Sequence, residues 1–346
     1  MTALHPDQRD DKRLLVIVGP TGSGKSTLAM ALAERLGGEI VNFDSLQLYR
    51  GFDIGTAKTP LAERRGIPHH LFDVIDAASG YASYSAGDYA RLARERIAEI
   101  SGRGRLPIAV GGSGFYLRAL LDGLPQLPAR DAGLRARLEM RESRREGSLH
   151  GLLRRLDPSA AARIHPRDVH KTIRALEVRL LTRAAAPAPE TAEPLTGYQV
   201  VQIGLNPDRA ELVKRLDARV MAMFAGGLID EVRGLLAHGA TGAEKPFESL
   251  GYKQALQYIH GQATLEQAIL STQIETRQYA KRQRTWFLRD SRIHWLAGTG
   301  PGRPSTQEGT RSSHAARGSF VPASSSIAGF GEDPEIVREA LRLARE

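Results

Sequence analysis

A glycine-rich run near the start of the chain limits the possible folds more than any other feature. Residues 19–26 read GPTGSGKS and fit the pattern G-x-x-x-x-G-K-[ST]. The apolar run Leu14–Val18 precedes them and leucines at helical spacing follow from Leu28, so a buried strand should lead through the glycines into a helix. There, backbone N–H groups can surround a multiply charged anion, Lys25 can neutralise phosphate oxygens, and the Ser26 hydroxyl suits Mg²⁺. The sequence predicts a phosphate-binding loop; the alternative is a glycine-rich turn without a ligand.

Strands and helices alternate on both sides of this loop. Glu39–Phe43 and Leu106–Val110 read as buried strands, and Tyr84–Ile100 reads as a helix between them. Val200–Leu205 reads as a strand that returns to the same sheet. This order predicts an α/β fold of the P-loop NTPase-like type, with a doubly wound parallel sheet.

A helical segment interrupts the alternation. From Asp131 to about residue 183 only helical periodicity is visible, and the proline-rich run Ala184–Pro194 follows it. We therefore expect a catalytic core formed by residues 13–125 and 196–297, with a helical insertion at 126–195. Residues 1–12 and 298–346 have too few apolar groups to offset chain entropy, so we expect flexible tails, with room for one short helix at Pro334–Arg345.

Charge is concentrated in two segments. Residues 126–183 hold fourteen basic and seven acidic side chains, a difference of +7, and residues 277–292 hold six and one, a difference of +5. Such segments are typical of surfaces that meet a polyanion. The alternative is that they are solvated, arginine-rich helices without a partner.

Other classes of protein are excluded by composition. The chain has no cysteine, which rules out disulfide scaffolds, iron–sulfur clusters and thiolate zinc sites. No apolar run is long enough to span a membrane, and the first residues do not read as a secretory signal. We expect a cytoplasmic monomer that does not bind membranes.

One acidic residue stands where chemistry on a bound phosphate compound would need it. Asp44 closes the predicted strand 39–43, and the carboxyl ends of neighbouring parallel strands face one crevice. Asp44 could therefore accept a proton from a nucleophile, although it could also simply cap a following helix. The strand 106–110 ends in Gly-Gly-Ser, without the strand-end acid that a motor ATPase usually presents.

Several blocks of sequence, in order from about Leu14 to Leu296, resemble the bacterial tRNA dimethylallyltransferases, also called tRNA isopentenyltransferases. The blocks are GPTGSGKS (19–26), DSLQLYRGFDIGTAK (44–58), PHHLFD (68–73), VGGSGFYLRALLDGL (110–124), AARIHPRDVHKTIRALEV (161–178), SLGYKQ (249–254) and YAKRQRTWF (279–287). The resemblance implies transfer of a dimethylallyl group from dimethylallyl diphosphate to the exocyclic amine of the adenine 3′ of the anticodon, in tRNAs that read U-starting codons. The product would be N6-dimethylallyladenosine (isopentenyladenosine). It also implies that the glycine loop holds an isoprenoid diphosphate rather than ATP, with Mg²⁺.

The resemblance also implies roles for individual residues. Asp44 would be the general base, Lys25 would act on the diphosphate, and Ser113, where the family usually has Thr, would lie beside the target nucleotide. Donor binding is implied for Gly19, Pro20, Thr21, Gly22, Ser23, Gly24, Lys25, Ser26, Arg215 and Arg219. Contact with the tRNA anticodon stem-loop is implied for Asp44, Ser45, Leu46, Gln47, Ser113, Arg135, His170, Lys171, Thr172, Ile173, Arg174, Glu248, Ser249, Leu250, Gly251, Tyr252, Lys253, Lys281, Arg282, Gln283, Arg284, Thr285, Trp286, Phe287 and Leu288.

The sequence departs from the family pattern at Arg289, which comes one position later than the arginine that usually follows Trp and an aromatic residue. If the helix continues, this shift rotates the side chain by ~100°. Extrusion of an adenine calls for flat side chains on which bases can stack. The candidates are Tyr49, Phe115, Tyr116 and Trp286, each of which could instead belong to the core. His69 and His70 lack a third metal ligand nearby, so we expect them to form loop hydrogen bonds.

Two other functions fit part of the sequence. A kinase that uses ATP on the same loop, with Asp44 activating a hydroxyl, would leave the two basic segments unused. An RNA-binding NTPase switch would use the basic segments but lacks the strand-end acid for Mg²⁺. The prenyltransferase hypothesis accounts for the loop, for Asp44 and for the basic segments together.

Overall fold

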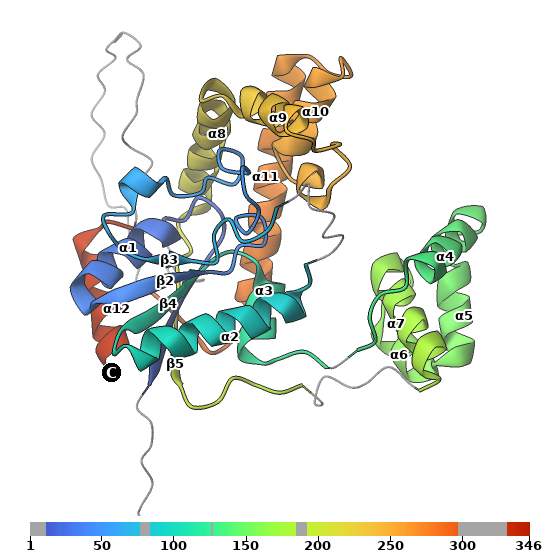
Figure 1. Cartoon of the computed structure of the whole chain (residues 1–346), viewed down its shortest axis with the longest axis horizontal. Coiled ribbons are helices and arrows are strands. Elements are labelled where there is room, and N and C mark those ends of the chain that lie inside the picture. Colours follow the sequence, from blue (N-terminus) through green and yellow to red (C-terminus); the bar gives the residue numbers. More distant parts are fainter. Residues whose placement is uncertain (1–11, 77–83, 126, 185–191, 297–330) are drawn as a thin grey trace, which may run out of the picture. The chain divides into compact units, whose positions relative to one another are not determined.

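The computed structural model describes residues 12–76, 84–125, 127–184, 192–296 and 331–346. The chain divides into two compact units (Figure 1). The first consists of residues 1–120 and 195–346, and the second of residues 121–194. The sequence analysis placed the insertion at 126–195, so its N-terminal boundary lies five residues earlier in the structure than expected.

The first unit is built on a six-stranded parallel sheet, which confirms the predicted α/β class. The strand order is β3-β2-β4-β1-β5-β6. The strands are β1 (Arg13–Val18), β2 (Gly38–Asn42), β3 (His69–His70), β4 (Leu106–Val110), β5 (Gln199–Gly204) and β6 (Ile293–Trp295). The short edge strands β3 and β6 were not predicted, because two or three residues carry too little periodicity to be recognised.

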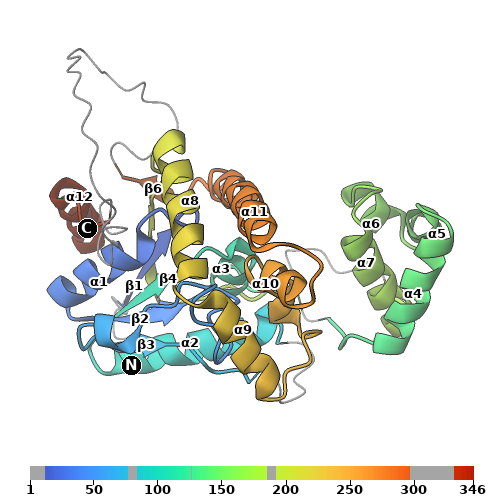
Figure 2. The same ribbon diagram turned by 90° about the horizontal axis from the view of Figure 1, so that it is seen from above.

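Helices connect and cover these strands (Figures 1 and 2). They are α1 (Lys25–Leu36), α2 (Ala86–Gly102), α3 (Gly114–Leu121), α8 (Arg209–Ala225), α9 (Leu228–Ala237), α10 (Tyr252–Ile259), α11 (Leu265–Phe287) and α12 (Pro334–Arg345), with short 3₁₀ turns at Leu61–Glu63 and Lys245–Glu248. One face of the sheet contributes Leu15, Ile108 and Ile203 to a core shared with Leu28 and Leu32 of α1. The phosphate-loop sequence thus sits at the end of a central strand, between β1 and α1.

The end of the chain requires a correction to the expected flexible tail. Residues 297–330 lie outside the described residues, but α12 is packed into the core of the first unit through Ile336, Val337, Ala340 and Ala344. Their spacing forms an apolar helical stripe, which the low average apolar content of the tail conceals. A backbone carbonyl of the helix, that of Ala344, also accepts a hydrogen bond of 3.0 Å from the Arg13 guanidinium.

The described part of the second unit contains the helices α4 (Ala132–Arg144), α5 (Ser148–Leu156), α6 (Pro158–Arg163) and α7 (Val169–Thr182). Asp131, Asp157 and Asp168 cap the N-termini of α4, α6 and α7 through their side-chain oxygens. The helices enclose a small core that includes Leu138, Leu149, Leu153, Ile173 and Leu176. This apolar core gives the unit its own folding determinants.

Candidate active site

The phosphate-loop sequence adopts a conformation that only glycine tolerates at several positions. Gly19, Gly22 and Gly24 have φ angles of 147°, 76° and 89°, which are strained for any residue with a side chain. A Cβ atom at Gly19 would also lie 2.4 Å from the carbonyl oxygen of Leu205. The Ser23 side chain is fully buried, and its Oγ has no hydrogen-bond partner among the described residues. A buried donor without a partner is costly and is consistent with a loop shaped around a polar ligand.

Two basic side chains converge at this loop. Lys25 donates a hydrogen bond of 2.8 Å to the carbonyl of Pro20. Part of the Lys25 side chain reaches the surface, but its ammonium lies among protein atoms, and burial lowers its pKa to about 7, with Asp44 raising it and Arg219 lowering it. Burial likewise lowers the pKa of Arg219 on α8, against a raising influence of Asp44. Lys25, Arg219 and Asp44 therefore share one electrostatic environment, with two cations facing one carboxylate, which favours a bound anion.

Asp44 is held by its neighbours and keeps one oxygen available. Its backbone N–H donates to Asn42 Oδ1 (2.8 Å), and its Oδ1 accepts from the N–H of Leu46 (3.0 Å). The residues that follow form a turn rather than a helix, so Asp44 does not act as a helix cap. Its Oδ2 accepts no hydrogen bond from the described part of the chain. The alternative of a purely structural aspartate is thereby weakened.

Ser113 and Tyr279 complete the surroundings of Asp44. The Ser113 hydroxyl accepts a hydrogen bond of 3.2 Å from the N–H of Ser45, the residue after Asp44. Tyr279 of α11 is hydrogen-bonded to Ser113, and its pKa is raised by burial and by the nearby charge of Asp44. Tyr279 lies within one of the sequence blocks that resemble the family, but no role was predicted for it. Its position is set by packing between α11 and the loop after β4, which local sequence does not reveal.

Helix α11 joins the two loops of the site through Gln283. This side chain accepts a hydrogen bond of 2.8 Å from the N–H of Thr21 and donates one of 2.9 Å to the carbonyl of Gly112. A Cβ atom at Gly112 would lie 2.2 Å from Gln283 Nε2, and one at Gly114 would lie 2.2 Å from Trp286 Nε1. The loop after β4 has the sequence Gly-Gly-Ser-Gly, where a motor ATPase would have a strand-end acid. Because α11 lies directly against this loop, Gly112 and Gly114 leave no room for a side chain.

The loop between β2 and β3 is fixed by buried polar groups. The Glu231 carboxylate of α9 accepts hydrogen bonds from the N–H groups of Asp53 (3.2 Å) and Ile54 (2.8 Å). The Tyr252 hydroxyl donates to Glu231 (2.5 Å) and accepts from the N–H of Gly55 (3.2 Å). Tyr252 is fully buried, so its side chain does not present a surface to tRNA in this structure. Its role is to anchor the loop that begins at Asp44.

The residues predicted to contact tRNA differ in their exposure. A side chain enclosed by protein packs within the fold and offers no surface to an RNA in this structure. The buried members of the predicted set are Thr172, Ile173, Gly251, Tyr252, Gln283 and Phe287. The exposed members are His170, Lys171, Glu248, Lys253, Lys281, Arg282, Thr285 and Trp286.

Two arginines of the second unit are engaged by an internal carboxylate. Glu177 of α7 is fully buried. Arg174 donates to it at 2.7 Å and to the carbonyl of Pro128 at 2.8 Å. Arg135 Nε lies 3.5 Å from the same carboxylate, an ion pair by distance but without the geometry of a hydrogen bond. Both arginines were predicted to contact tRNA, and in the structure each serves to neutralise Glu177.

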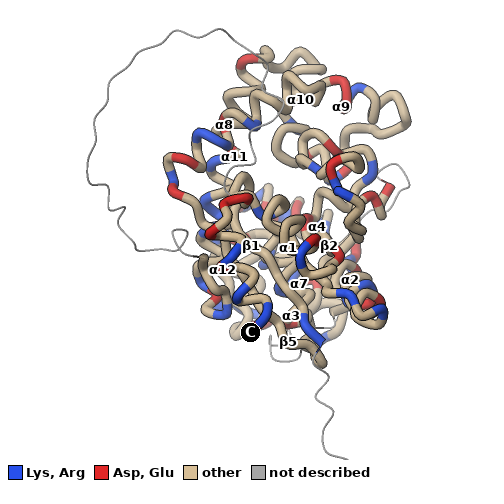
Figure 3. Tube along the Cα trace, turned by 90° about the vertical axis from the view of Figure 1, so that its left-hand side faces the viewer, with Lys and Arg blue, Asp and Glu red and all other residues tan. Residues whose placement is uncertain are grey.

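Basic and acidic residues are interleaved along α8 and α11 (Figure 3). Arg277 pairs with Asp217 of α8 at 2.8 Å, and Arg284 donates to Asn206 at 2.8 Å. Arg289 lies beyond the end of α11, in the following turn. The expected rotation of Arg289 along a continued helix is therefore wrong. The basic character of residues 277–292 is partly used within the protein.

The four aromatic candidates for base stacking divide into two pairs. Phe115 and Trp286 are 52% and 45% exposed. Tyr49 is buried with its ring against Phe52, and Tyr116 packs on Tyr89 with ring centroids 4.8 Å apart. Phe115 and Trp286 each present an exposed face, whereas Tyr49 belongs to the core and Tyr116 is half-buried.

The histidine pair forms hydrogen bonds, as expected, but from the strand β3 rather than from a loop. His69 Nδ1 lies 2.8 Å from the carbonyl of Ile67, and His70 Nε2 lies 2.7 Å from Glu39. Within the described ranges there is no group of three His, Asp or Glu residues that could hold a metal ion. None of the described helices is long and apolar enough to cross a membrane.

Comparison with known proteins identifies a family for this chain. The family model described as IPP transferase matches residues 47–290, and the model described as isopentenyl transferase matches residues 12–80. The tRNA dimethylallyltransferase of Solibacter usitatus is 59% identical over 82% of this chain and 92% of its own length. That of Koribacter versatilis is 50% identical over 84% of this chain and 94% of its own length.

Solved structures lead to the same family. The full-length tRNA isopentenylpyrophosphate transferase of Bacillus halodurans matches with a TM-score of 0.61 and 39% identity, over 83% of this chain and 90% of that one. A eukaryotic dimethylallyltransferase, studied in crystallographic snapshots while acting on tRNA, matches with a TM-score of 0.70 and 29% identity, over 84% of this chain and 74% of that one. The phosphate loop, Asp44 and the helical insertion thus occur together in a chain that belongs to the tRNA dimethylallyltransferase family.

Proposed function

We propose that this protein transfers the dimethylallyl group of dimethylallyl diphosphate to the exocyclic amine of the adenine 3′ of the anticodon in tRNAs reading U-starting codons, with Asp44 as the general base. The observation that carries the proposal is the shared environment of Asp44, Lys25 and Arg219 at the glycine loop. An anion site and a proton acceptor meet there, and this reaction needs both.

The donor half of the reaction uses the glycine loop. The bond between the allylic carbon and the diphosphate oxygen breaks, so negative charge grows on the departing diphosphate. Backbone N–H groups of the loop, Lys25 and Arg219 are positioned to stabilise that charge, and fixed dipoles and charges of this kind usually make the largest catalytic contribution. The Ser26 hydroxyl, in the first turn of α1, would hold Mg²⁺, and the bound ion would add further charge neutralisation.

The acceptor half of the reaction uses Asp44. The adenine amine is a weak nucleophile because its lone pair is delocalised into the ring. As the new bond between nitrogen and carbon forms, the amine loses a proton, and Asp44 Oδ2 can take it. Assistance by such a base contributes ~10²–10⁴-fold. The Ser113 hydroxyl, next to the loop of Asp44, is suited to orient the target adenine.

Recognition of tRNA would combine stacking and charge. A stacked adenine cannot reach the loop, so it has to leave the anticodon stack. The exposed rings of Phe115 and Trp286 provide stacking surfaces of the type that RNA-binding proteins use. Exposed basic residues of α11, Lys281 and Arg282, can contact phosphates nearby.

The decisive experiment offers two donors to the same acceptor. The protein is incubated with unmodified tRNA, Mg²⁺ and either dimethylallyl diphosphate or ATP, and the digested nucleosides are weighed. We expect prenylated adenosine with the first donor. Hydrolysis or transfer from ATP without prenylation would instead support a kinase or an NTPase switch and refute the proposal.

The role of Asp44 is tested by Asp44→Asn, with Asp230→Asn as a matched control on the exposed surface of α9. We expect turnover to fall by ~10²–10⁴-fold. Binding of the donor should not weaken, because the substitution removes a negative charge beside Lys25 and Arg219. A loss of turnover no larger than that of the control would contradict a general-base role.

A further inference from the structure

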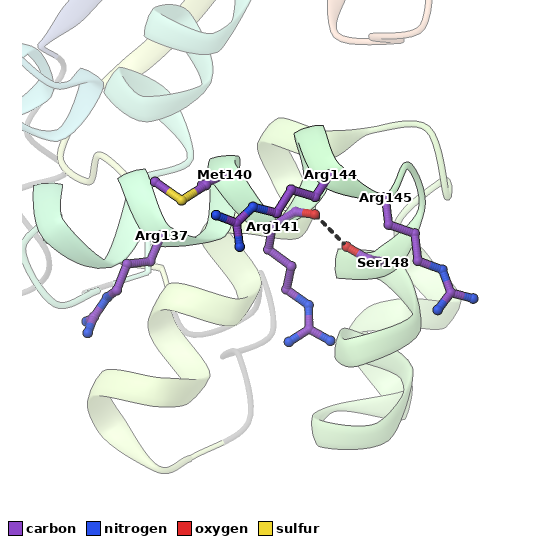
Figure 4. A pocket seen from close by; sticks show the side chains of 6 residues that line it. All are labelled: Arg137, Met140, Arg141, Arg144, Arg145 and Ser148. Carbon is purple, nitrogen blue, oxygen red and sulfur yellow. Dashed lines mark hydrogen bonds between the residues drawn. The ribbon is translucent and has the colours of Figure 1, made fainter.

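The polar features outside the groups of the proposed reaction differ in their burial. A hollow of about 460 Å³ in the second unit is rimmed by exposed arginines and lined by Arg137, Met140, Arg141, Arg144, Arg145 and Ser148 (Figure 4). It belongs to the basic segment 126–183, whose surface is already expected to meet a polyanion. Gln283 of α11 is the opposite case, because only 6% of it is exposed and both ends of its carboxamide are hydrogen-bonded to the main chain. A buried polar side chain with such partners fixes where the partner segments lie.

Gln283 holds one peptide unit of the glycine loop. Its Oε1 accepts a hydrogen bond of 2.8 Å from the N–H of Thr21. The carbonyl of the same peptide unit belongs to Pro20, and it accepts hydrogen bonds from the Lys25 ammonium (2.8 Å) and from the N–H of Ser23 (3.2 Å). Because a peptide unit is planar, fixing the direction of its N–H also fixes the direction of its carbonyl. Gln283 therefore sets the point at which the Lys25 ammonium is held.

The other end of the carboxamide holds a peptide unit of the loop after β4. Gln283 Nε2 donates a hydrogen bond of 2.9 Å to the carbonyl of Gly112, which belongs to the peptide unit that leads into Ser113. The strands that precede the two loops, β1 and β4, are neighbours in the sheet, so the loops lie side by side at its carboxyl edge. One side-chain amide thus spans the loop that carries Lys25 and the loop that carries Ser113.

The chemistry of the two partners requires an amide at this position. The N–H of Thr21 can only donate and the carbonyl of Gly112 can only accept, so an oxygen must face the first and a nitrogen the second. A carboxylate would offer no donor to Gly112, and an apolar side chain would leave both backbone groups unpaired. Either loss is costly in a buried place.

Tyr279, one turn earlier on α11, extends the contact towards the proposed base. Residues four apart on a helix share one face. The Tyr279 hydroxyl is hydrogen-bonded to Ser113 and Gln283, and its pKa is raised by burial and by the charge of Asp44. This face of α11 therefore meets the groups that serve both halves of the proposed reaction.

We propose that Gln283 is a positioning residue for the prenyl transfer. Through the peptide unit 20–21 it places the Lys25 ammonium for the donor diphosphate, and through the peptide unit 112–113 it keeps Ser113 at a fixed separation from the glycine loop. The inference rests on the proposed function, because that function gives Lys25 and Ser113 their roles. Gln283 acts on the reaction through these two residues.

The first test is a cycle of variants in which Gln283→Met removes both hydrogen bonds while keeping the length of the side chain. Gln278→Met, at an exposed position of the same helix, is the matched control. Calorimetry with inorganic diphosphate at about pH 6, below the pKa of Lys25, should show binding weakened by roughly 10-fold in Gln283→Met and unchanged in Gln278→Met. In a Lys25→Met background, Gln283→Met should weaken binding by no more than about 2-fold, because the group that it places is gone.

The same cycle is read in kcat/KM for dimethylallyl diphosphate, which stays measurable where binding is weak. Turnover of Gln283→Met at saturating substrates should fall by roughly 10- to 100-fold, the usual cost of a small misplacement. Affinity for unmodified tRNA, measured without a donor, should stay at the wild-type value, which a direct contact or a loosened fold would not allow. All variants are assayed well below their melting temperatures.

Two results would overturn the inference. One is a Gln283→Met variant that binds diphosphate and turns over like Gln278→Met. The other is an effect of Gln283→Met on kcat/KM that persists in full when Lys25 is replaced, since the two residues would then act independently.

The two proposals fail in different ways. If the wild type prenylates tRNA and Gln283→Met behaves like the control, the positioning role is lost and the proposed function stands. If Gln283 and Lys25 are coupled in diphosphate binding but the wild type forms no prenylated adenosine, the positioning of Lys25 stands and the proposed function is refuted.

Discussion

The contact between Gly331 and the phosphate loop gives a quantitative prediction for Gly331→Ala. Gly331 precedes α12 and is buried. A Cβ atom at this position would lie 2.2 Å from the carbonyl oxygen of Gly24 and 3.0 Å from the backbone nitrogen of Leu28. Ordinary contact begins at 3.4 Å, so the methyl group needs about 1 Å of additional separation. Both opposing atoms belong to the backbone, and no flexible side chain can move aside.

The displacement falls on the first turn of α1. The carbonyl of Gly24 accepts a hydrogen bond of 3.0 Å from Leu28, and Gly24 is the residue before Lys25. Overpacking of this kind costs ~1–3 kcal/mol of stability. A misplacement of ~1 Å at a catalytic group can cost ~10²-fold in rate. We therefore expect Gly331→Ala to lower kcat/KM for dimethylallyl diphosphate by roughly 10- to 100-fold, and to leave the affinity for tRNA unchanged.

The assay combines steady-state kinetics with calorimetric binding of inorganic diphosphate and thermal unfolding. Gly234→Ala on α9 is the matched control, since a Cβ atom there meets nothing within 4 Å. The control should keep wild-type kinetics and gain slightly in stability, because alanine favours a helix over glycine. If Gly331→Ala bound diphosphate and turned over like Gly234→Ala, the C-terminal segment would have no influence on the loop.

Three further predictions concern protons, a buried hydroxyl and the second unit. The pKa of Lys25 is about 7 in the free protein, and a bound anion favours the ammonium form. Above pH 7, inorganic diphosphate should therefore bind with uptake of a proton, and its affinity should fall by ~10-fold per pH unit. Calorimetry without metal at pH 8 in two buffers that shows no proton uptake would contradict this. Tyr252→Phe removes the hydrogen bonds that the hydroxyl makes to Glu231 Oε1 and to the N–H of Gly55 and should cost ~1–3 kcal/mol in denaturant unfolding, whereas Tyr258→Phe should be neutral. Leu153→Ala, in the core of the second unit, should cost ~2–5 kcal/mol, seen as faster amide exchange across residues 121–194; exchange confined to α5 would argue against one cooperative unit.

The parts of the site that could be predicted from sequence are those encoded in a few consecutive residues. The glycine loop is one, because its motif, the preceding strand and the following helix are adjacent in the chain. Asp44 is another, because the end of a parallel strand fixes which edge of the sheet it occupies. The parallel sheet itself followed from the alternation of strands and helices.

The parts that could not be predicted depend on residues far apart in sequence. Gln283 was expected to face tRNA, yet it bridges Thr21 and Gly112, because α11 crosses both loops. Arg174 appeared free until the structure placed it on the buried Glu177. Whether a charged side chain is exposed or neutralised depends on tertiary packing, which composition and periodicity do not encode.

The helix α12 was expected at these residues, but its packing against the first unit was missed for a different reason. Its sequence was recognised as able to form a helix, but the surrounding Gly-, Ser- and Pro-rich residues suggested a loose tail. The missing information was the uncovered apolar surface of α1 and β5 against which Ile336 and Val337 pack. A short amphipathic helix becomes stable only when such a surface exists.

The bond between Thr21 and Gln283 spans 262 residues, and this has a consequence for biosynthesis. A ribosome adds ~5–20 residues per second, so the glycine loop leaves the exit tunnel roughly 10–50 s before the residue that holds it. During that interval the nascent chain has the loop sequence but not its final support. Chains that end before α11 therefore lack the hydrogen bond by which Gln283 holds the N–H of Thr21.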